Sequence, residues 1–180
     1  MQYPSAQDQA DLIRAARTDT EAFGLLYDCY VQPLYRYCYH RTNNARDAED
    51  LTSQTFLAAL EAFPRLRRDG HFAAWLFTVA RNKIADHYRR TASVPLEESA
   101  VPPSQSDPAD EAETSQRKAL LLRSIGVLAD DEQELIRLRY VADLPFAEIA
   151  RALHKTEDAT KKMLYRLLAR LRSQMEAGHE

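Results

Sequence analysis

Residues 93–116 divide this chain of 180 residues into two parts, because they cannot contribute a folded core. The stretch reads SVPLEESAVPPSQSDPADEAETSQ and contains four prolines, five serines and six acidic residues but no basic one. Such a composition buries too little apolar surface to offset the entropy lost on folding. We therefore expect two modules, residues 1–92 and 117–180, joined by a flexible acidic linker.

Both modules are predicted to be helical. The chain has only four Gly, and outside the linker it is rich in Ala, Leu, Arg and Glu, which favour helices. Apolar residues recur at spacings of three and four, and no segment alternates as a strand would. The predicted fold class is all-α, with two small helical domains. Helices are expected at residues 8–17, 20–41, 45–63, 72–90, 115–127 and 130–140, followed by a helix-turn-helix.

The charge of the chain is segregated along the sequence. The formal net charge of −3 would by itself count against a nucleic-acid partner. Residues 65–92 carry a net charge of +5, however, the linker carries −6, and residues 151–172 carry +5. Each module thus has a basic region suited to phosphate groups.

Several classes of protein are not expected from this sequence. No run of about 18 apolar residues predicts a membrane span, and the first residues, MQYPSAQDQADLIRAAR, lack the apolar core of a secretory signal, so we expect a cytoplasmic protein. Cys29 and Cys38 lie on opposite sides of one predicted helix and cannot pair there. The five His share no metal-type spacing, and the acidic cluster at 47–50 has no phosphate loop or His beside it. We expect no metal, no cofactor and no enzymatic activity.

The helix at 45–63 is predicted to have two faces. Ala48, Thr52, Phe56, Ala59, Leu60 and Phe63 form the inward one. The outward face, called the acidic stripe below, consists of Asp47, Asp50, Gln54, Leu57 and Glu61. An acidic stripe can simply be solvated, but Leu57 within it also suits a protein partner with a basic surface.

The helix at 72–90 has a polar and cationic face that contains Thr78, Arg81, Asn82 and Arg89. The basic sequence RLRRDGH precedes this helix, and aromatic residues flank it. Cations and an amide along one face suit backbone contact and base stacking on single-stranded nucleic acid. Solvent exposure of long basic side chains is the alternative interpretation.

The second module ends in LPFAEIARALHKTEDATKKMLYRLLARLRSQM, which indicates a helix-turn-helix. Pro145 is expected at the start of the first helix and Thr156 as the cap of the second. A short helix, a turn and a longer basic helix are typical of proteins that place the second helix in the major groove. The packing seam comprises Ile149, Ala150, Leu153, Leu164, Leu167, Leu168 and Leu171, and the opposite side comprises Lys161, Lys162, Tyr165, Arg166 and Arg170.

Three segments together resemble a known family. AEDLTSQTFLAALEAF, FAAWLFTVARNKIADHYRR and LADDEQELIRLRYVADLPFAEIARAL, in this order around an acidic linker, are similar to bacterial RNA polymerase sigma factors of the extracytoplasmic-function (ECF) group. The resemblance implies that residues 1–92 are sigma domain 2, which binds the beta-prime clamp helices of core polymerase and melts the minus-10 element. Residues 117–180 would be sigma domain 4, which binds the beta flap and the minus-35 element. An anti-sigma factor is a common partner in this family.

The resemblance also assigns residues to surfaces. The acidic stripe of Asp47, Asp50, Gln54, Leu57 and Glu61 matches the polymerase-binding helix. The minus-10 residues are Thr78, Arg81, Asn82, Arg89 and Arg90, called the basic stripe below, together with Arg67, Arg68 and His71 at the pocket for an unstacked base. The minus-35 residues are Thr160, Lys161, Lys162, Tyr165, Arg166 and Arg170, called the recognition surface below.

The second module departs from the family pattern at three places, one of which is Leu167 and Leu168, where relatives often place Ala and Arg. His154 stands where relatives usually have Gly in the turn, and a side chain there costs roughly 1 kcal/mol if the backbone is left-handed. Residues 159–163 read ATKKM where T-V-K-S-R is common, so Met163 removes an expected Arg. A helix-turn-helix regulator that acts without polymerase is the alternative function, and it would leave the acidic stripe without a purpose.

Overall fold

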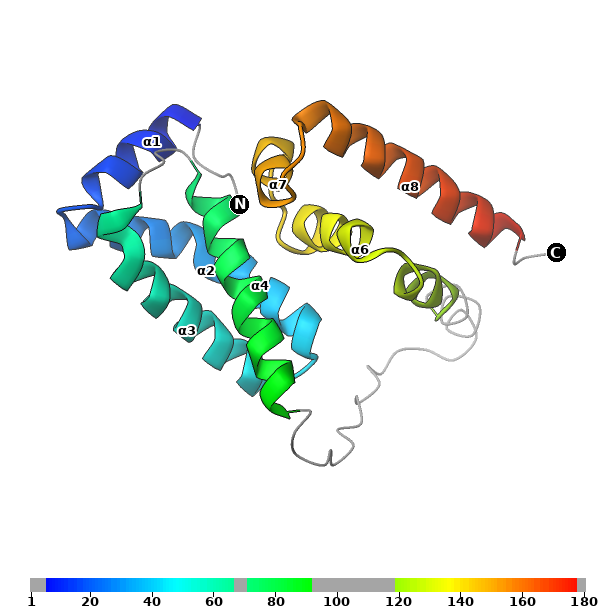
Figure 1. Ribbon diagram of the computed structural model, residues 1–180, viewed down its shortest axis with the longest axis horizontal. Helices are drawn as coiled ribbons and strands as arrows, with labels where there is room; N and C mark the ends of the chain where they lie inside the picture. The colour runs from blue at the N-terminus through cyan, green and yellow to red at the C-terminus, as the bar shows by residue number, and fades with distance from the viewer. Residues whose placement is uncertain (1–5, 67–70, 92–118, 178–180) are drawn as a thin grey trace, which may run out of the picture.

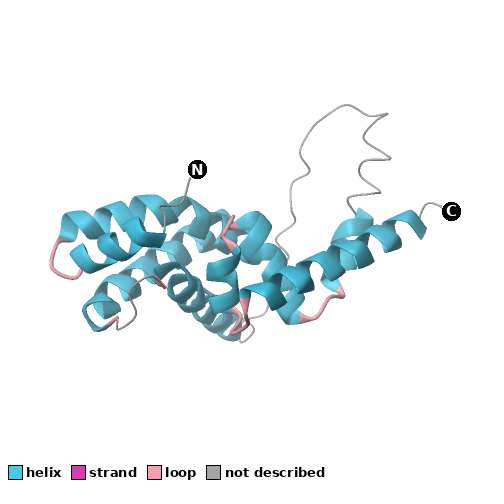
Figure 2. Cartoon of the chain, turned by 90° about the horizontal axis from the view of Figure 1, so that it is seen from above, coloured by secondary structure: helices cyan, strands magenta, loops and turns pink. Residues whose placement is uncertain are grey.

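The computed structural model describes residues 6–66, 71–91 and 119–177. All regular elements in this part of the chain are helical, as predicted (Figures 1 and 2). The linker, residues 93–116, lies outside the described residues. The elements are α1 (Ala6–Ala15), α2 (Thr20–Thr42), α3 (Ala45–Ala62), the short 3-10 helix η1 (Phe63–Arg65), α4 (Phe72–Thr91), α6 (Asp130–Ile136), the π-helical segment η2 (Arg137–Val141), α7 (Phe146–Ala152) and α8 (Glu157–Ala177), with a further helical stretch at residues 119–126.

The first module has an aromatic core that α2, α3 and α4 share (Figure 1). Phe72, the first residue of α4, is fully buried, and its ring centroid lies 5.5 Å from that of Tyr30 and 5.6 Å from that of Phe63. Such edge-to-face contacts add to the free energy gained by burying the rings. This core fixes α4 against α2 and α3, so the outward faces of α3 and α4 belong to one rigid body.

The second module contains the predicted helix-turn-helix in α7 and α8. Pro145 precedes α7, and the hydroxyl of Thr156 accepts a hydrogen bond from the Ala159 N–H at 3.2 Å, so both predicted helix starts are confirmed. His154 in the turn has a φ of 55°, the left-handed conformation that a glycine adopts without strain. The replacement of the family's usual Gly by His154 therefore costs about 1 kcal/mol of backbone strain.

The helix expected at 130–140 is regular only in its first half. α6 ends at Ile136 and continues as η2, in which the N–H of Ala142 donates to the carbonyl of Arg137 at 2.9 Å. This five-residue spacing widens the helix by one residue, a feature that is common at functional sites. Leu138 within η2 is buried, and η2 packs against α2 of the first module.

The two modules are in direct contact. α7 packs against α4, and η2 packs against α2, so that the second module lies beside the first (Figure 1). Leu135, Leu138 and Ile149 belong to the same buried apolar cluster as Phe72 and Phe77. The sequence predicts two modules but does not predict this contact between them.

Candidate interfaces for polymerase and DNA

The acidic stripe lies on the outward side of α3. Asp50, Gln54, Leu57 and Glu61 are exposed, and Asp47 is partly exposed. Leu57 has 58% of its surface exposed, so an apolar side chain lies open to solvent among the acidic ones. The structure thus brings all five residues of the stripe to one surface.

The apolar part of this surface is larger than predicted. Leu60 was expected to face inward, but 46% of its surface is exposed, so this prediction is wrong. The buried face of α3 also includes Leu51 and Thr55, two residues that the helical projection did not include. This arrangement leaves Leu57 and Leu60 exposed three residues apart, where they form one apolar patch beside the acidic side chains.

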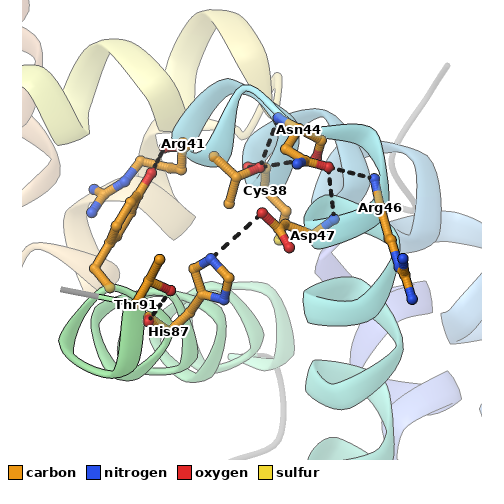
Figure 3. A network of polar contacts seen from close by, with 9 residues as sticks. Cys38, Arg41, Asn44, Arg46, Asp47, His87 and Thr91 are labelled. Carbon is orange, nitrogen blue, oxygen red and sulfur yellow. Dashed lines mark hydrogen bonds and ion pairs between the residues drawn. The ribbon is translucent and has the colours of Figure 1, made fainter. Parts of the chain in front are cut away.

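The start of α3 is held by a network of polar contacts (Figure 3). Asn44 caps the helix, because its side-chain oxygen accepts hydrogen bonds from the N–H groups of Arg46 at 2.9 Å and Asp47 at 3.2 Å. Asp47 Oδ2 lies 3.6 Å from Nε2 of His87 on α4. The N-terminal end of the acidic stripe is therefore fixed to the C-terminal half of α4.

Replacing Asn44 by Ala is expected to lower the free energy of unfolding by about 1 kcal/mol, because two N–H groups at the start of α3 lose their acceptor. Urea denaturation followed by circular dichroism measures this change. Asn44→Asp keeps an acceptor at the cap and is the matched control. An Asn44→Ala protein as stable as the control would show that the cap does not hold the stripe.

The basic stripe on α4 is exposed at one end and partly covered at the other. Asn82, Arg89 and Arg90 are exposed, whereas Thr78 and Arg81 are partly buried where the second module approaches α4. Arg89 forms an ion pair with Asp86 on its own helix, so Asp86 sets the direction of this cation. His71 is partly buried beside Trp75, and Arg67 and Arg68 lie outside the described residues.

The recognition surface lies along α8. Lys162, Tyr165, Arg166 and Arg170 are exposed there, and Tyr165 has 65% of its surface exposed. Lys161 Nζ lies 2.6 Å from Glu157, and this hydrogen bond raises the pKa of the lysine.

Thr160 does not belong to this exposed surface. Its side chain is fully buried, and its hydroxyl donates to the carbonyl of Thr156 at 2.9 Å. The helical phase explains the difference, because Thr160, Leu164, Leu167 and Leu171 follow spacings of four, three and four along the packing seam. The threonine therefore packs against the second module's core in this structure, and the prediction that it contacts DNA is corrected.

The cysteines are placed for packing. Both are free, and burial raises the pKa of Cys38 to about 11 and also raises that of Cys29. A thiol with a raised pKa is a weak nucleophile at neutral pH.

The described residues contain neither a candidate metal site nor a candidate membrane span. Within the described ranges, no group of three or more His, Cys, Asp or Glu side chains could hold a metal ion. None of the helices in those ranges combines the length and the apolar character that crossing a bilayer requires.

Comparison with known families matches both modules. The family model "Sigma-70 region 2" matches residues 26–94, and the model "Sigma-70, region 4" matches residues 118–171. A solved structure of CnrH in complex with the cytosolic domain of CnrY has the same fold, with a TM-score of 0.64 at 24% identity over 94% of this chain and 97% of that chain. The chain thus has the fold of this structure and matches the models of sigma-70 regions 2 and 4.

Curated relatives define the group more closely. The ECF RNA polymerase sigma factor SigL of Mycobacterium tuberculosis is 32% identical over 164 residues, which cover 88% of this chain and 91% of SigL. The ECF RNA polymerase sigma factor BldN of Streptomyces coelicolor is 39% identical over 166 residues, which cover 88% of this chain but only 62% of BldN. The chain belongs to the ECF RNA polymerase sigma factors, a group of transcription initiation factors, and the resemblance inferred from its sequence segments is confirmed.

Proposed function

We propose that this sigma factor binds core RNA polymerase through the acidic stripe of α3, at the beta-prime clamp helices. The observation that carries the proposal is the exposed apolar pair Leu57 and Leu60 within an acidic helix face. Apolar side chains supply the buried centre of an interface, and the surrounding carboxylates select a basic partner surface. Because Asp47 contacts His87 on α4, binding at this stripe would also position α4 on the polymerase.

We also propose that each module binds one element of the promoter. Residues 1–92 act as sigma domain 2, in which Asn82, Arg89 and Arg90 hold the melted minus-10 strand. Exposed cations suit the phosphates, and the Asn82 amide can donate to and accept from a base. Residues 117–180 act as sigma domain 4, in which α8 enters the major groove of the minus-35 element and the module also contacts the beta flap.

The protein itself performs no bond chemistry in this account, because the polymerase makes the RNA. It works where the polymerase and the promoter are, in the cytoplasm, and it needs no cofactor. We also expect an anti-sigma factor as a partner, because such proteins are common partners in this family.

Replacing Lys162 and Arg166 together by Ala is expected to weaken binding to the minus-35 element roughly three- to tenfold near physiological salt, because two phosphate-binding cations are removed. The dependence of log affinity on log salt should lose about one unit per contact. Fluorescence anisotropy of holoenzyme on labelled promoter DNA, titrated at several salt concentrations, measures both quantities.

Arg172→Ala is the control for this pair, since Arg172 is an exposed base on the same helix that pairs with Glu176. Because the control removes one charge and the pair removes two, a loss in the control of about half the size on a logarithmic scale would mean that only the net charge of α8 matters. Unchanged binding in the double variant would remove Lys162 and Arg166 from the DNA surface.

Binding measurements with and without core enzyme test the proposed function against the rival one. A sigma factor should form a stable complex with purified core polymerase and should bind duplex promoter DNA tightly only as part of that complex. Tight, sequence-specific duplex binding by the protein alone, without affinity for core polymerase, would favour a regulator that acts by itself.

A further inference from the structure

A polar cavity of about 450 Å³ lies where the second module meets the first. Three arginines line it, namely Arg41 on α2, Arg81 on α4 and Arg137 in η2, together with Gln133 and Glu134 on α6. Its volume falls within the range of pockets that hold small molecules. Both modules therefore supply side chains to a space of the size of a small-ligand site.

One buried carboxylate serves as the counter-charge inside this cavity. Glu134 is 5% exposed, and its Oε1 accepts a hydrogen bond from the hydroxyl of Tyr37 at 2.6 Å. Its Oε2 lies 3.5 Å from the guanidinium of Arg41 and 3.4 Å from that of Arg137. Both distances exceed the value of about 2.8 Å that is typical of a charge-assisted hydrogen bond. A single carboxylate oxygen is thus shared loosely between two guanidinium groups.

Arg81 adds a positive charge that no carboxylate of the described residues neutralises at ion-pair distance. Its side chain is partly buried. Asp130 and Asp131 also line the cavity, but both are exposed, and Asp131 is paired with Lys155 at 3.1 Å. Among the buried and partly buried charges of the cavity, three guanidinium groups therefore face the one carboxylate of Glu134. Charges removed from water are unfavourable unless an opposite charge replaces the lost hydration.

The protonation of His40, which also lines the cavity, agrees with an excess of positive charge. Burial, followed by the charges of Arg137 and Arg41, lowers the pKa of His40. The imidazole is therefore neutral at neutral pH and adds no further charge. An anion that enters this space meets cations that are already in place and lack a full complement of acceptors.

We propose that this cavity binds a small ligand that carries a diphosphate group, such as a nucleoside diphosphate. The planar guanidinium donates two parallel hydrogen bonds to phosphate oxygens, which makes arginine well suited to this group. A diphosphate supplies the negative charge that Arg41, Arg81 and Arg137 lack. Gln133 and Asp130 offer oxygen atoms that accept hydrogen bonds from the hydroxyl groups of a nucleoside.

The position of the site gives such a ligand an effect on the whole protein. Because residues of both modules form the cavity, the ligand binds the arrangement in which the modules are in contact and stabilises it by mass action. The concentration of a small phosphorylated compound then acts on the sigma factor directly. The site itself requires neither core polymerase nor DNA.

Isothermal titration calorimetry of the full chain tests the site at constant ionic strength, with ADP, inorganic pyrophosphate and sulfate as probes. We expect at least one of the two diphosphate probes to bind one site with a Kd of about 100 μM or below. Sulfate should bind at least about tenfold more weakly, because it carries fewer oxygen atoms and less charge than a diphosphate. Tighter binding of ADP than of pyrophosphate would identify the ligand as a nucleotide, and equal binding would identify the diphosphate alone as the recognised group.

Arg81→Gln should weaken binding of the diphosphate probe about tenfold or more, because a charge-assisted hydrogen bond is lost. Arg81 has no ion pair with another described residue, so the variant should keep its fold, which circular dichroism checks. Arg137→Gln should weaken binding similarly. Arg36→Gln is the matched control, since Arg36 is exposed on α2 and does not line the cavity.

Four results would overturn the proposal. They are the absence of binding by both diphosphate probes, sulfate binding as tight as theirs, equal affinities of wild type and Arg81→Gln, and an equal loss in Arg36→Gln. If Arg81→Gln instead weakens only the binding of promoter DNA by the holoenzyme, the residue belongs to the DNA surface and the ligand site is rejected. The titrations contain no polymerase and no promoter, so they judge this site independently of the proposed function.

Discussion

Replacing Asp50 by Arg should weaken binding to core RNA polymerase roughly 30-fold or more, because a charge that faces a basic partner is reversed near the centre of an interface. Asp50 is exposed on α3, one turn before Gln54 and two turns before Leu57, and it forms no ion pair with another of the described residues. The fold should therefore be unaffected. A titration of labelled sigma factor with core polymerase measures the affinity, and thermal unfolding of the free protein checks the fold.

Glu49→Arg provides the matched control for this experiment. Glu49 is also exposed in the same turn of α3 but lies about 100° away from Asp50 around the helix, outside the acidic stripe. The control should retain most of its affinity. Equal affinities for Asp50→Arg and wild type would remove the acidic stripe from the interface, and equal losses in both variants would mean that only the total charge of α3 is sensed.

Replacing Arg89 and Arg90 together by Ala should reduce promoter opening by roughly tenfold or more, because both cations at the exposed end of the basic stripe are lost where the melted strand must be held. The salt dependence of promoter binding should also become shallower, by somewhat less than two units. Opening is measured by permanganate reactivity of unpaired thymines in the holoenzyme complex. Neither arginine lines the pockets between the two modules, so this result does not depend on how the modules are docked.

Arg14→Ala with Arg36→Ala removes the same amount of charge from exposed positions of the first module that lie outside the basic stripe. This control should open the promoter like wild type. Normal opening by the Arg89 and Arg90 variant would show that the DNA surface has been placed on the wrong part of α4.

Much of the fold could be predicted because local signals and apolar periodicity agree. Asn44 and Thr156 cap helices where an Asn or Thr precedes an apolar pattern, and the observed bounds of α2, α3 and α4 lie within one residue of those expected. The left-handed turn at His154 could be predicted only through the family resemblance, since a histidine does not itself signal a positive φ.

The wrong predictions for Leu60 and Thr160 have a common cause, which is the packing of neighbouring helices. Leu60 is exposed and Thr160 is buried because neighbouring helices set which part of a helix surface is covered, and a projection from one sequence places that boundary only approximately. The docking of the modules was not predictable for a similar reason. Glu134 and Glu148 look like surface carboxylates, and only the tertiary structure brings Tyr37 and Ala74 to them.

Run-off transcription with purified core RNA polymerase and a promoter library tests the central claim most directly. With the sigma factor added, we expect transcripts that start at defined positions, from templates that share two sequence elements at a fixed spacing. Core polymerase alone should not give these transcripts. The absence of any promoter-dependent transcript, together with no binding to core polymerase, would contradict the account.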